Sequence, residues 1–171
     1  MDGNLKIFDA AIPAQPVIAT NPLPAANGLA IRADLGGSMQ LNVSDLIGVP
    51  FVDGGRDPDT GLDCWGLFMI VMDRLGTPVP DYKISCFDST EIGRAARHAL
   101  ATQWKKVYQP APGVGLVLDI DPAKPGIKQH FGVCVSKDRF IHTLEKTGVI
   151  LTKLSDGFWK AKIKGMYKWK K

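Results

Sequence analysis

The chain of 171 residues is long enough to form one domain with a sizeable core, and 45% of its residues are hydrophobic. It has no apolar run long enough to cross a bilayer and no basic-then-apolar start, so we expect synthesis in the cytoplasm without a signal peptide. Its three cysteines, Cys64, Cys86 and Cys134, match neither a disulfide framework nor a zinc site. We therefore expect no metal and no other cofactor.

Charge is unevenly distributed along the chain. Residues 1–101 carry 7 Lys and Arg against 12 Asp and Glu (net −5), whereas residues 102–171 carry 14 against 5 (net +9). A basic half can meet an anionic polymer. The lysines between residues 160 and 168 instead alternate with apolar residues, as on the solvated face of a strand. No base-stacking pattern accompanies them, so we expect no nucleic-acid partner.

The first 38 residues differ from the rest of the chain. Four prolines between residues 13 and 24 break any regular element, and only residues 29–35 favour a short strand. Gly36-Gly37-Ser38 resembles a flexible join. We expect residues 1–38 to be an extended arm, a tether or an expression remnant, and residues 39–171 to be the functional domain.

Helices are predicted in the first half of that domain. A short helix within residues 43–52 is capped by Ser44 or Asp45, and a buried helix over 64–75 has Asp63 as its N-cap. A third helix begins after Asp88 and continues amphipathically to about residue 105, with His98 on its polar side.

Strands follow the helices. The candidates, separated by turn signals, are residues 114–120, 129–135, 139–144, 149–154 and 162–169. Helices first and strands second predict an α+β fold in which the helix that begins at Cys64 packs on an antiparallel sheet.

Cys64 is the strongest candidate for a reactive residue, although most free cysteines are core residues. It follows the glycine-rich loop of residues 54–61 and opens a helix, where unpaired N–H groups and the helix dipole stabilise a thiolate. We therefore expect a lowered pKa and faster alkylation than at the other two cysteines. Gly66 would let a substrate backbone approach the sulfur.

A thiol nucleophile needs a base and a group that orients the base, and His130 and His142 fall on neighbouring predicted strands. A hairpin centred on Ser136 would set the two histidines opposite each other. A later centre, which the turn residues slightly favour, would offset them too far for contact. Cys134 lies about 13 Å along the strand from His130, too far to share it as a base.

Three motifs together resemble those of the NlpC/P60 cell-wall cysteine peptidases. Asp63-Cys64-Trp65-Gly66-Leu67 is similar to that family's cysteine motif. His130-Phe131-Gly132-Val133 and Phe140-Ile141-His142-Thr143 are similar to its two histidine segments, and residues 163–168 to its last strand. The resemblance covers about residues 44–169. Trp65, with the Gly48–Phe51 and Gly55–Asp57 segments, looks most like the phage-tail branch.

The resemblance implies a papain-like fold that cleaves peptidoglycan stem peptides, typically between γ-D-glutamate and diaminopimelate. It assigns Cys64 as nucleophile, His130 as general base and acid, and His142 as the orienting residue. The backbone N–H of Cys64 would contribute to the oxyanion hole, and Asp63, Trp65 and Gly66 would lie near the substrate.

The sequence departs from the family pattern at Phe51, which stands near the place of a tyrosine that reaches the active site and lacks the hydroxyl. The branch implies a place at the virion tail tip among other tail proteins, acting in the host periplasm or cell wall. Two alternatives stay open: a structural tail-tip component with little activity, or a transferase that uses the same cysteine for amide or acyl transfer.

Overall fold

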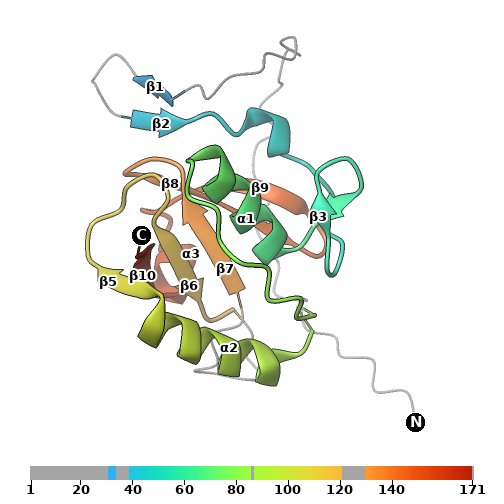
Figure 1. The fold of residues 1–171 in the computed structure, drawn as a ribbon. Helices are drawn as coiled ribbons and strands as arrows, with labels where there is room; N and C mark the ends of the chain where they lie inside the picture. The colour runs from blue at the N-terminus through green and yellow to red at the C-terminus, as the bar shows by residue number, and fades with distance from the viewer. Residues whose placement is uncertain (1–30, 34–38, 86, 121–129, 171) are drawn as a thin grey trace.

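The computed structural model describes residues 31–33, 39–85, 87–120 and 130–170 (Figure 1). The helices within these residues are η1 (a 3-10 helix, Ser44–Leu46), α1 (Cys64–Arg74), α2 (Ser89–Thr102) and α3 (Gly157–Lys162). The strands are β1 (Ile31–Ala33), β2 (Met39–Leu41), β3 (Arg56–Asp57), β4 (Gly61–Leu62), β5 (Trp104–Val107), β6 (Gly115–Leu118), β7 (His130–Cys134), β8 (Arg139–Leu144), β9 (Gly148–Lys153) and β10 (Ile163–Trp169).

Six strands form the main antiparallel sheet, in the order β5-β10-β6-β7-β8-β9. The predicted meander is present from β6 to β9. After β9 the chain crosses the sheet, and β10 inserts between β5 and β6, pairing with both. Strand β10 thereby joins β5 to the rest of the sheet, and β7 and β8 lie in the interior between β6 and β9.

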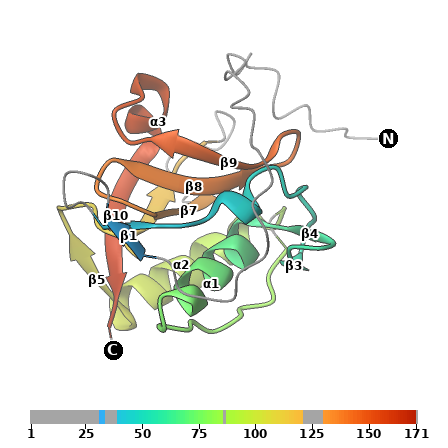
Figure 2. The ribbon, with the colours of Figure 1, turned by 90° about the horizontal axis from the view of Figure 1, so that it is seen from above.

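Helices α1 and α2 lie on one side of the sheet, and the short α3 lies on the other (Figure 2). Helix α1 packs across β7 and β8, the strands that carry the two histidines. The predicted α+β arrangement, with the cysteine helix on an antiparallel sheet, is confirmed.

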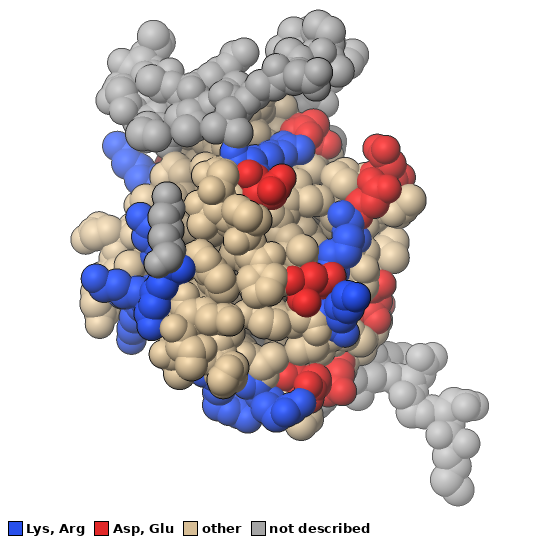
Figure 3. Space-filling view, in the orientation of Figure 1, with Lys and Arg blue, Asp and Glu red and all other residues tan. Residues whose placement is uncertain are grey.

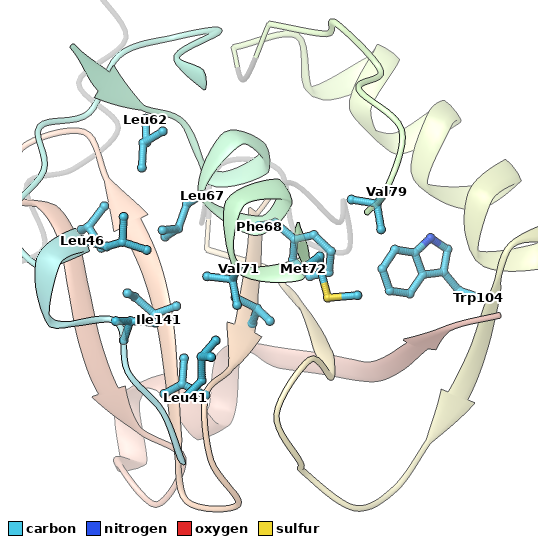
Figure 4. Packing of buried hydrophobic residues seen from close by; sticks show 14 of the residues in the cluster. Leu41, Leu46, Leu62, Leu67, Phe68, Val71, Met72, Val79, Trp104 and Ile141 are labelled. Atoms are coloured by element: carbon cyan, nitrogen blue, oxygen red, sulfur yellow. The ribbon is translucent and has the colours of Figure 1, made fainter. Parts of the chain in front are cut away.

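The core between α1 and the sheet is apolar and tightly filled (Figure 4). Leu67, Phe68 and Val71 of α1 are at most 1% exposed and face buried sheet residues that include Ile141. Burying a side chain of this kind contributes about 1.5–3 kcal/mol. This packing fixes α1, and with it the position of Cys64 at the helix start.

The predicted starts of α1 and α2 are confirmed. The Asp63 carboxylate accepts a hydrogen bond from the Gly66 N–H, and Asp88 accepts one from the Glu91 N–H. Helix α1 ends where Gly76 adopts a φ of +64°, a conformation that glycine reaches without strain.

Three element predictions are corrected. Helix α2 ends at Thr102, and Trp104 belongs to β5, because its indole packs into the core as a strand residue. Lys160 and Lys162 lie in the last turn of α3 instead of on a strand face. The predicted helix within residues 43–52 is reduced to η1, where Asn42, instead of Ser44 or Asp45, accepts the Ser44 N–H.

The N-terminal arm lies largely outside the described residues. Within it, residues 31–33 form β1, inside the predicted strand 29–35, and pair with β2. The Leu41 N–H of β2 donates to the Val135 carbonyl next to β7. The division at residue 38 stays a prediction.

Candidate active site

Cys64 is the first residue of α1, and the backbone around it is held by the carboxylate of Asp63. One oxygen of Asp63 accepts the Gly66 N–H at 2.6 Å, and the other accepts the Gly54 N–H at 3.1 Å. Asp63 is 1% exposed, so both bonds lie away from water. The carboxylate therefore joins the glycine loop to the helix start and fixes the direction in which Cys64 leaves it.

Arg56 of β3 compensates the buried charge of Asp63. Its guanidinium lies 2.8 Å from the Asp63 carboxylate and 2.9 Å from that of Asp81. The same guanidinium donates to the Gly55 carbonyl at 2.9 Å. Because Asp63 is buried, its ion pair with Arg56 holds the glycine loop, the start of α1 and the segment after α1 in one arrangement.

The thiol of Cys64 is buried, and burial together with the nearby Asp63 charge raises its pKa to about 12. Hydrogen bonds from the backbone of Phe131 and of Cys64 itself, and the charge of Arg56, act in the opposite direction. The expected lowering of the pKa by the helix start is therefore wrong for the resting site. The cost of removing a thiolate from water raises the pKa by more than a few oriented N–H groups lower it.

His130, His142 and Thr152 form a buried hydrogen-bonded chain across β7, β8 and β9. Nε2 of His130 lies 3.0 Å from Nδ1 of His142, and Nε2 of His142 lies 3.1 Å from the Thr152 hydroxyl. All three residues are at most 5% exposed. Burial lowers the pKa of His130 to about 4 and also lowers that of His142, so both rings are neutral at pH 7.

The register between β7 and β8 has the later of the two predicted hairpin centres, at Lys137. Val133 pairs with Ile141, and continuing by one residue sets His142 opposite Gly132 instead of His130. The histidines are thus diagonal neighbours, offset by two residues. The expectation that an offset would separate them is wrong, because diagonal side chains of this length can still meet.

The pairing of β7 with β8 stops before His130. It covers Val133↔Ile141 and Cys134↔Phe140, although β8 continues along β9 to Leu144. The start of α1 meets the sheet at this end of β7, where the Phe131 backbone contacts the thiol. Cys64 is thereby brought to the residue next to His130. The hydrogen bonds among the described residues do not include one between the thiol and His130.

Gly66 serves a different purpose from the one expected. A Cβ at this position would lie 2.0 Å from the Gly55 carbonyl oxygen. The space that glycine leaves is filled by the loop and not by a substrate. Phe51 forms an isolated bridge to Leu62, and its ring meets Phe87 edge-on at 6.2 Å.

Trp65 lies beside the thiol with its ring against aromatic neighbours. It stacks on Phe68 with ring centroids 5.1 Å apart and meets Phe131 edge-on, while its indole N–H donates to the Pro80 carbonyl at 3.1 Å. Trp65, Phe68 and Phe131 line an apolar pocket that reaches Cys64.

Sequence reasoning missed Thr152, Arg56 and the pocket. A lone threonine on a strand carries no signal of its own, because its partner depends on which strands pair. Arg56 stands seven residues before Asp63, and the short β3–β4 hairpin that brings them together was not predicted.

Within the described residues, no group of three or more His, Cys, Asp and Glu side chains is placed to hold a metal ion. None of the described helices is long and apolar enough to cross a membrane.

A buried thiol at a helix start, next to a hydrogen-bonded histidine pair on an antiparallel sheet, places this domain among the papain-like α+β proteins. The model of the NlpC/P60 family matches residues 48–168, and the chain belongs to this family.

The chain is 31% identical over 121 residues to a gamma-DL-glutamyl hydrolase of Bacillus subtilis, which covers 70% of this chain. It spans about a quarter of that relative's length (26%). A solved structure of a lipoprotein-like member of the same family from Staphylococcus aureus is 21% identical. That match covers 72% of this chain and 37% of the other, with a TM-score of 0.49.

Proposed function

We propose that this domain is a cysteine endopeptidase that hydrolyses peptidoglycan stem peptides, with Cys64 as nucleophile, His130 as base and acid, and His142 as the orienting residue. The observation that carries the proposal is the 3.0 Å hydrogen bond between His130 and His142, together with a thiol at a helix start that contacts the backbone of Phe131, the residue after His130. Membership of the NlpC/P60 family supports the same reaction.

The hydrogen bonds define which nitrogen would take the thiol proton. Nε2 of His130 is engaged by His142, which leaves Nδ1 for Cys64. For Nδ1 to accept a proton, the resting ring must carry its own proton on Nε2 and donate it to His142. His142 then holds its proton on Nε2 and donates to Thr152. With Nδ1 of His130 as the acceptor, this tautomer assignment satisfies both hydrogen bonds of the chain.

In the proposed reaction, Cys64 Sγ attacks the scissile carbonyl carbon as its proton passes to His130. The backbone N–H of Cys64 stabilises the oxyanion, and His130 gives the proton to the departing amine as the C–N bond breaks. Water, deprotonated by His130, then hydrolyses the thioester and releases the acid and the thiol. Burial raises the pKa of Cys64 to about 12 and lowers that of His130 to about 4, so both groups are neutral at rest.

The bond we propose is the amide between γ-D-glutamate and diaminopimelate. The resemblance to cell-wall peptidases supports it, and a relative named as a gamma-DL-glutamyl hydrolase supports a γ-glutamyl linkage. Phe51, which lacks a hydroxyl and packs on Phe87, would leave the oxyanion to backbone donors.

The test is digestion of purified sacculi and of a stem tetrapeptide, with products identified by mass spectrometry. The wild-type protein should release fragments ending in D-glutamate, and Cys64→Ala should release none. Cys134→Ala is the matched control and should keep activity, because Cys134 lies in an apolar core cluster and the hydrogen bonds of the two histidines among the described residues do not include it. No fragments from the wild type, or equal release by Cys64→Ala, would refute the proposal. Products joined to a second amine would identify a transferase.

We further propose that the protein acts at a phage or prophage tail tip during cell-wall penetration, together with other tail proteins. The support is the resemblance of the Trp65 motif and its preceding loop to the tail branch. Co-purification with tail-tip proteins from particles of the producing strain tests it. Full binding by Cys64→Ala, without any hydrolysis by the wild type, would favour the structural alternative.

A further inference from the structure

Lysine side chains gather on one face of the sheet, along β10 and its neighbours. Residues 157–169, which form α3 and β10, carry four lysines and no Asp or Glu. Lys105 of β5 adds a fifth, because it pairs directly with Lys168 of β10. Trp104 and Trp169, which also pair, pack in the cluster around α1. Their neighbours Lys105 and Lys168 therefore point to the opposite face.

That opposite face also carries α3. Val107 and Met166 lie on it and pack against the cluster that contains Trp159 of α3. Figure 2 shows β10 running from α3 to its end beside β5. The lysines at the α3 end are Lys160 and Lys162 in the last turn of α3 and Lys164, which donates to the Ala161 carbonyl. We call the five side chains the basic face: Lys105, Lys160, Lys162, Lys164 and Lys168.

The charge of the basic face is not compensated by acidic partners. The ion pairs found within the described residues include none of these lysines. Four of the five are exposed, and the ammonium of the partly buried Lys162 lies 5.7 Å from the Phe158 ring. In Figure 3 the left edge of the molecule, around β5 and the end of the chain, shows a group of Lys or Arg side chains without Asp or Glu among them. Like charges directly opposite across two strands are destabilising, so the Lys105–Lys168 pair has a cost that a bound anion would offset.

Protection of the sheet edge explains only part of this arrangement. Lysines on an edge strand prevent its pairing with another chain, and β5 is at the edge of the sheet. Strand β10 lies between β5 and β6, so Lys164 and Lys168 have no edge to protect. The positive charge on this interior strand therefore points to an anionic partner.

The basic face begins close to the histidines of the proposed site. Leu118 of β6 pairs with His130 of β7 and also with Ile163, the first residue of β10. Neighbouring strands lie about 4.8 Å apart, so the start of β10 is about 10 Å from His130. A polymer that enters the active site can therefore also meet these lysines.

Peptidoglycan, the proposed substrate, carries the complementary charge. D-glutamate that is linked through its γ-carboxyl keeps a free α-carboxylate, and each diaminopimelate adds another carboxylate. These anions recur along the polymer. Lys164 and Lys168 are about 13 Å apart along the strand, so the face can meet carboxylates at more than one place on the polymer.

We propose that the basic face binds stem-peptide carboxylates of peptidoglycan outside the active site and holds the enzyme on the wall between cleavages. The inference rests on the proposed function for the identity of the polymer. It assigns binding to side chains that belong to neither the cysteine motif nor the histidine motifs.

Binding is measured separately from cleavage by sedimentation of purified sacculi with the full chain carrying Cys64→Ala. Lys105→Gln with Lys168→Gln should raise the Kd about 10-fold at about 50 mM salt, and this difference should disappear at about 500 mM. Lys160→Gln with Lys164→Gln should have a similar effect. The matched control is Lys137→Gln with Lys153→Gln, at two exposed positions in the β7–β8 turn and on β9, which should change the Kd less than 2-fold.

Activity gives a readout that damage to the fold would not give. With Cys64 present, Lys105→Gln with Lys168→Gln should slow the digestion of sacculi about 10-fold at low salt. It should leave the hydrolysis of a soluble stem tetrapeptide unchanged, because a single short peptide does not depend on a second contact with the wall. An equal loss on both substrates would overturn the inference.

Two treatments of the sacculi identify the anion. Amidation of their carboxylates with a carbodiimide and an amine should remove the difference between the Lys105→Gln, Lys168→Gln variant and the control. Sacculi stripped of phosphate polymers with hydrofluoric acid should still bind, and loss of binding after this treatment would overturn the inference in favour of wall phosphates. Equal Kd values of variant and control on untreated sacculi would refute the basic face alone. Salt-sensitive binding without any hydrolysis by the wild type would refute the peptidase proposal alone.

Discussion

Cys64 and Cys134 are both buried, and burial raises the pKa of each to about 12. Their neighbours differ. Cys134 lies in an apolar cluster with Phe140 and Trp159, whereas Cys64 adjoins a pocket and the backbone of Phe131, the residue that follows His130. The difference between a core cysteine and a candidate nucleophile therefore lies in the groups that can receive its proton, and not in its resting pKa.

The largest effect should come from removing the proton acceptor. His130→Gln keeps a polar side chain of similar size but cannot act as a base, so stem-peptide hydrolysis (kcat/KM) should fall about 10³-fold. The control is His98→Gln, at an exposed position on α2, which should change kcat/KM less than 2-fold. A His130→Gln variant with near-normal activity would show that His130 is not the proton acceptor.

A second test compares the two thiols directly. In the folded protein at pH 8, iodoacetamide should modify Cys64 about 100-fold faster than Cys134, because Cys64 borders the pocket, through which the reagent can reach the sulfur. Peptide mapping over time measures both rates in one sample. Equal rates would show that the two environments are equivalent for thiolate formation.

Much of the cysteine site could be predicted because its signals are local. Asp63 before Cys64 is an N-cap, and the glycines around it permit the close contact that the structure shows between Gly66 and Gly55. The histidines were identified by type and approximate strand. The register between their two strands was not identified, since a difference of one residue in the turn changes every cross-strand pair, and the turn residues alone do not fix the register.

The features that the sequence did not predict depend on contacts between segments that are distant along the chain. Strand β10, inserted between β5 and β6, pairs with β5 residues about 60 positions earlier in the chain, and no local sequence pattern predicts this pairing. The pocket likewise draws on α1, α2, the segment before α2 and four strands. The resting pKa of Cys64 was misjudged for the same reason, because burial depends on everything that packs around the helix start.

A third prediction concerns the pH dependence of stability. His130 has a pKa of about 4 in the folded protein against an ordinary 6.5, so the unfolded chain binds a proton between these values that the folded chain does not. Stability should therefore be complete above about pH 6.5 and fall as the pH drops toward 4, by about 2 kcal/mol between pH 7 and 5 from His130 alone. Urea unfolding at several pH values measures this.

The same series in His130→Gln should show a shallower loss, while His98→Gln should reproduce the wild type. A pH-independent stability between 7 and 5 would mean that the histidine pair is charged or hydrated in the folded state. The histidine pair would then be accessible to water, unlike the buried thiol of Cys134.

The smallest effect separates two buried threonines on neighbouring strands. The Thr152 hydroxyl is bonded to His142, whereas the Thr143 hydroxyl is buried without a hydrogen-bond partner in the described structure. Thr152→Val keeps the shape but removes the partner that fixes the His142 tautomer, so kcat should fall about 5-fold with KM unchanged. Thr143→Val removes an unsatisfied hydroxyl and should leave kcat unchanged while raising stability by up to about 1 kcal/mol.

Thr152→Ser restores a hydroxyl at the same position and should recover most of the lost kcat, which a purely structural role for the threonine methyl would not predict. If Thr152→Val and Thr143→Val have the same kcat, the functional hydrogen-bonded chain ends at His142. If their kcat values differ as expected, that chain includes Thr152 of β9. The edge of the sheet then takes part in orienting the base, because a neutral His142 can accept from His130 only while its own proton is held at Nε2 by that hydroxyl.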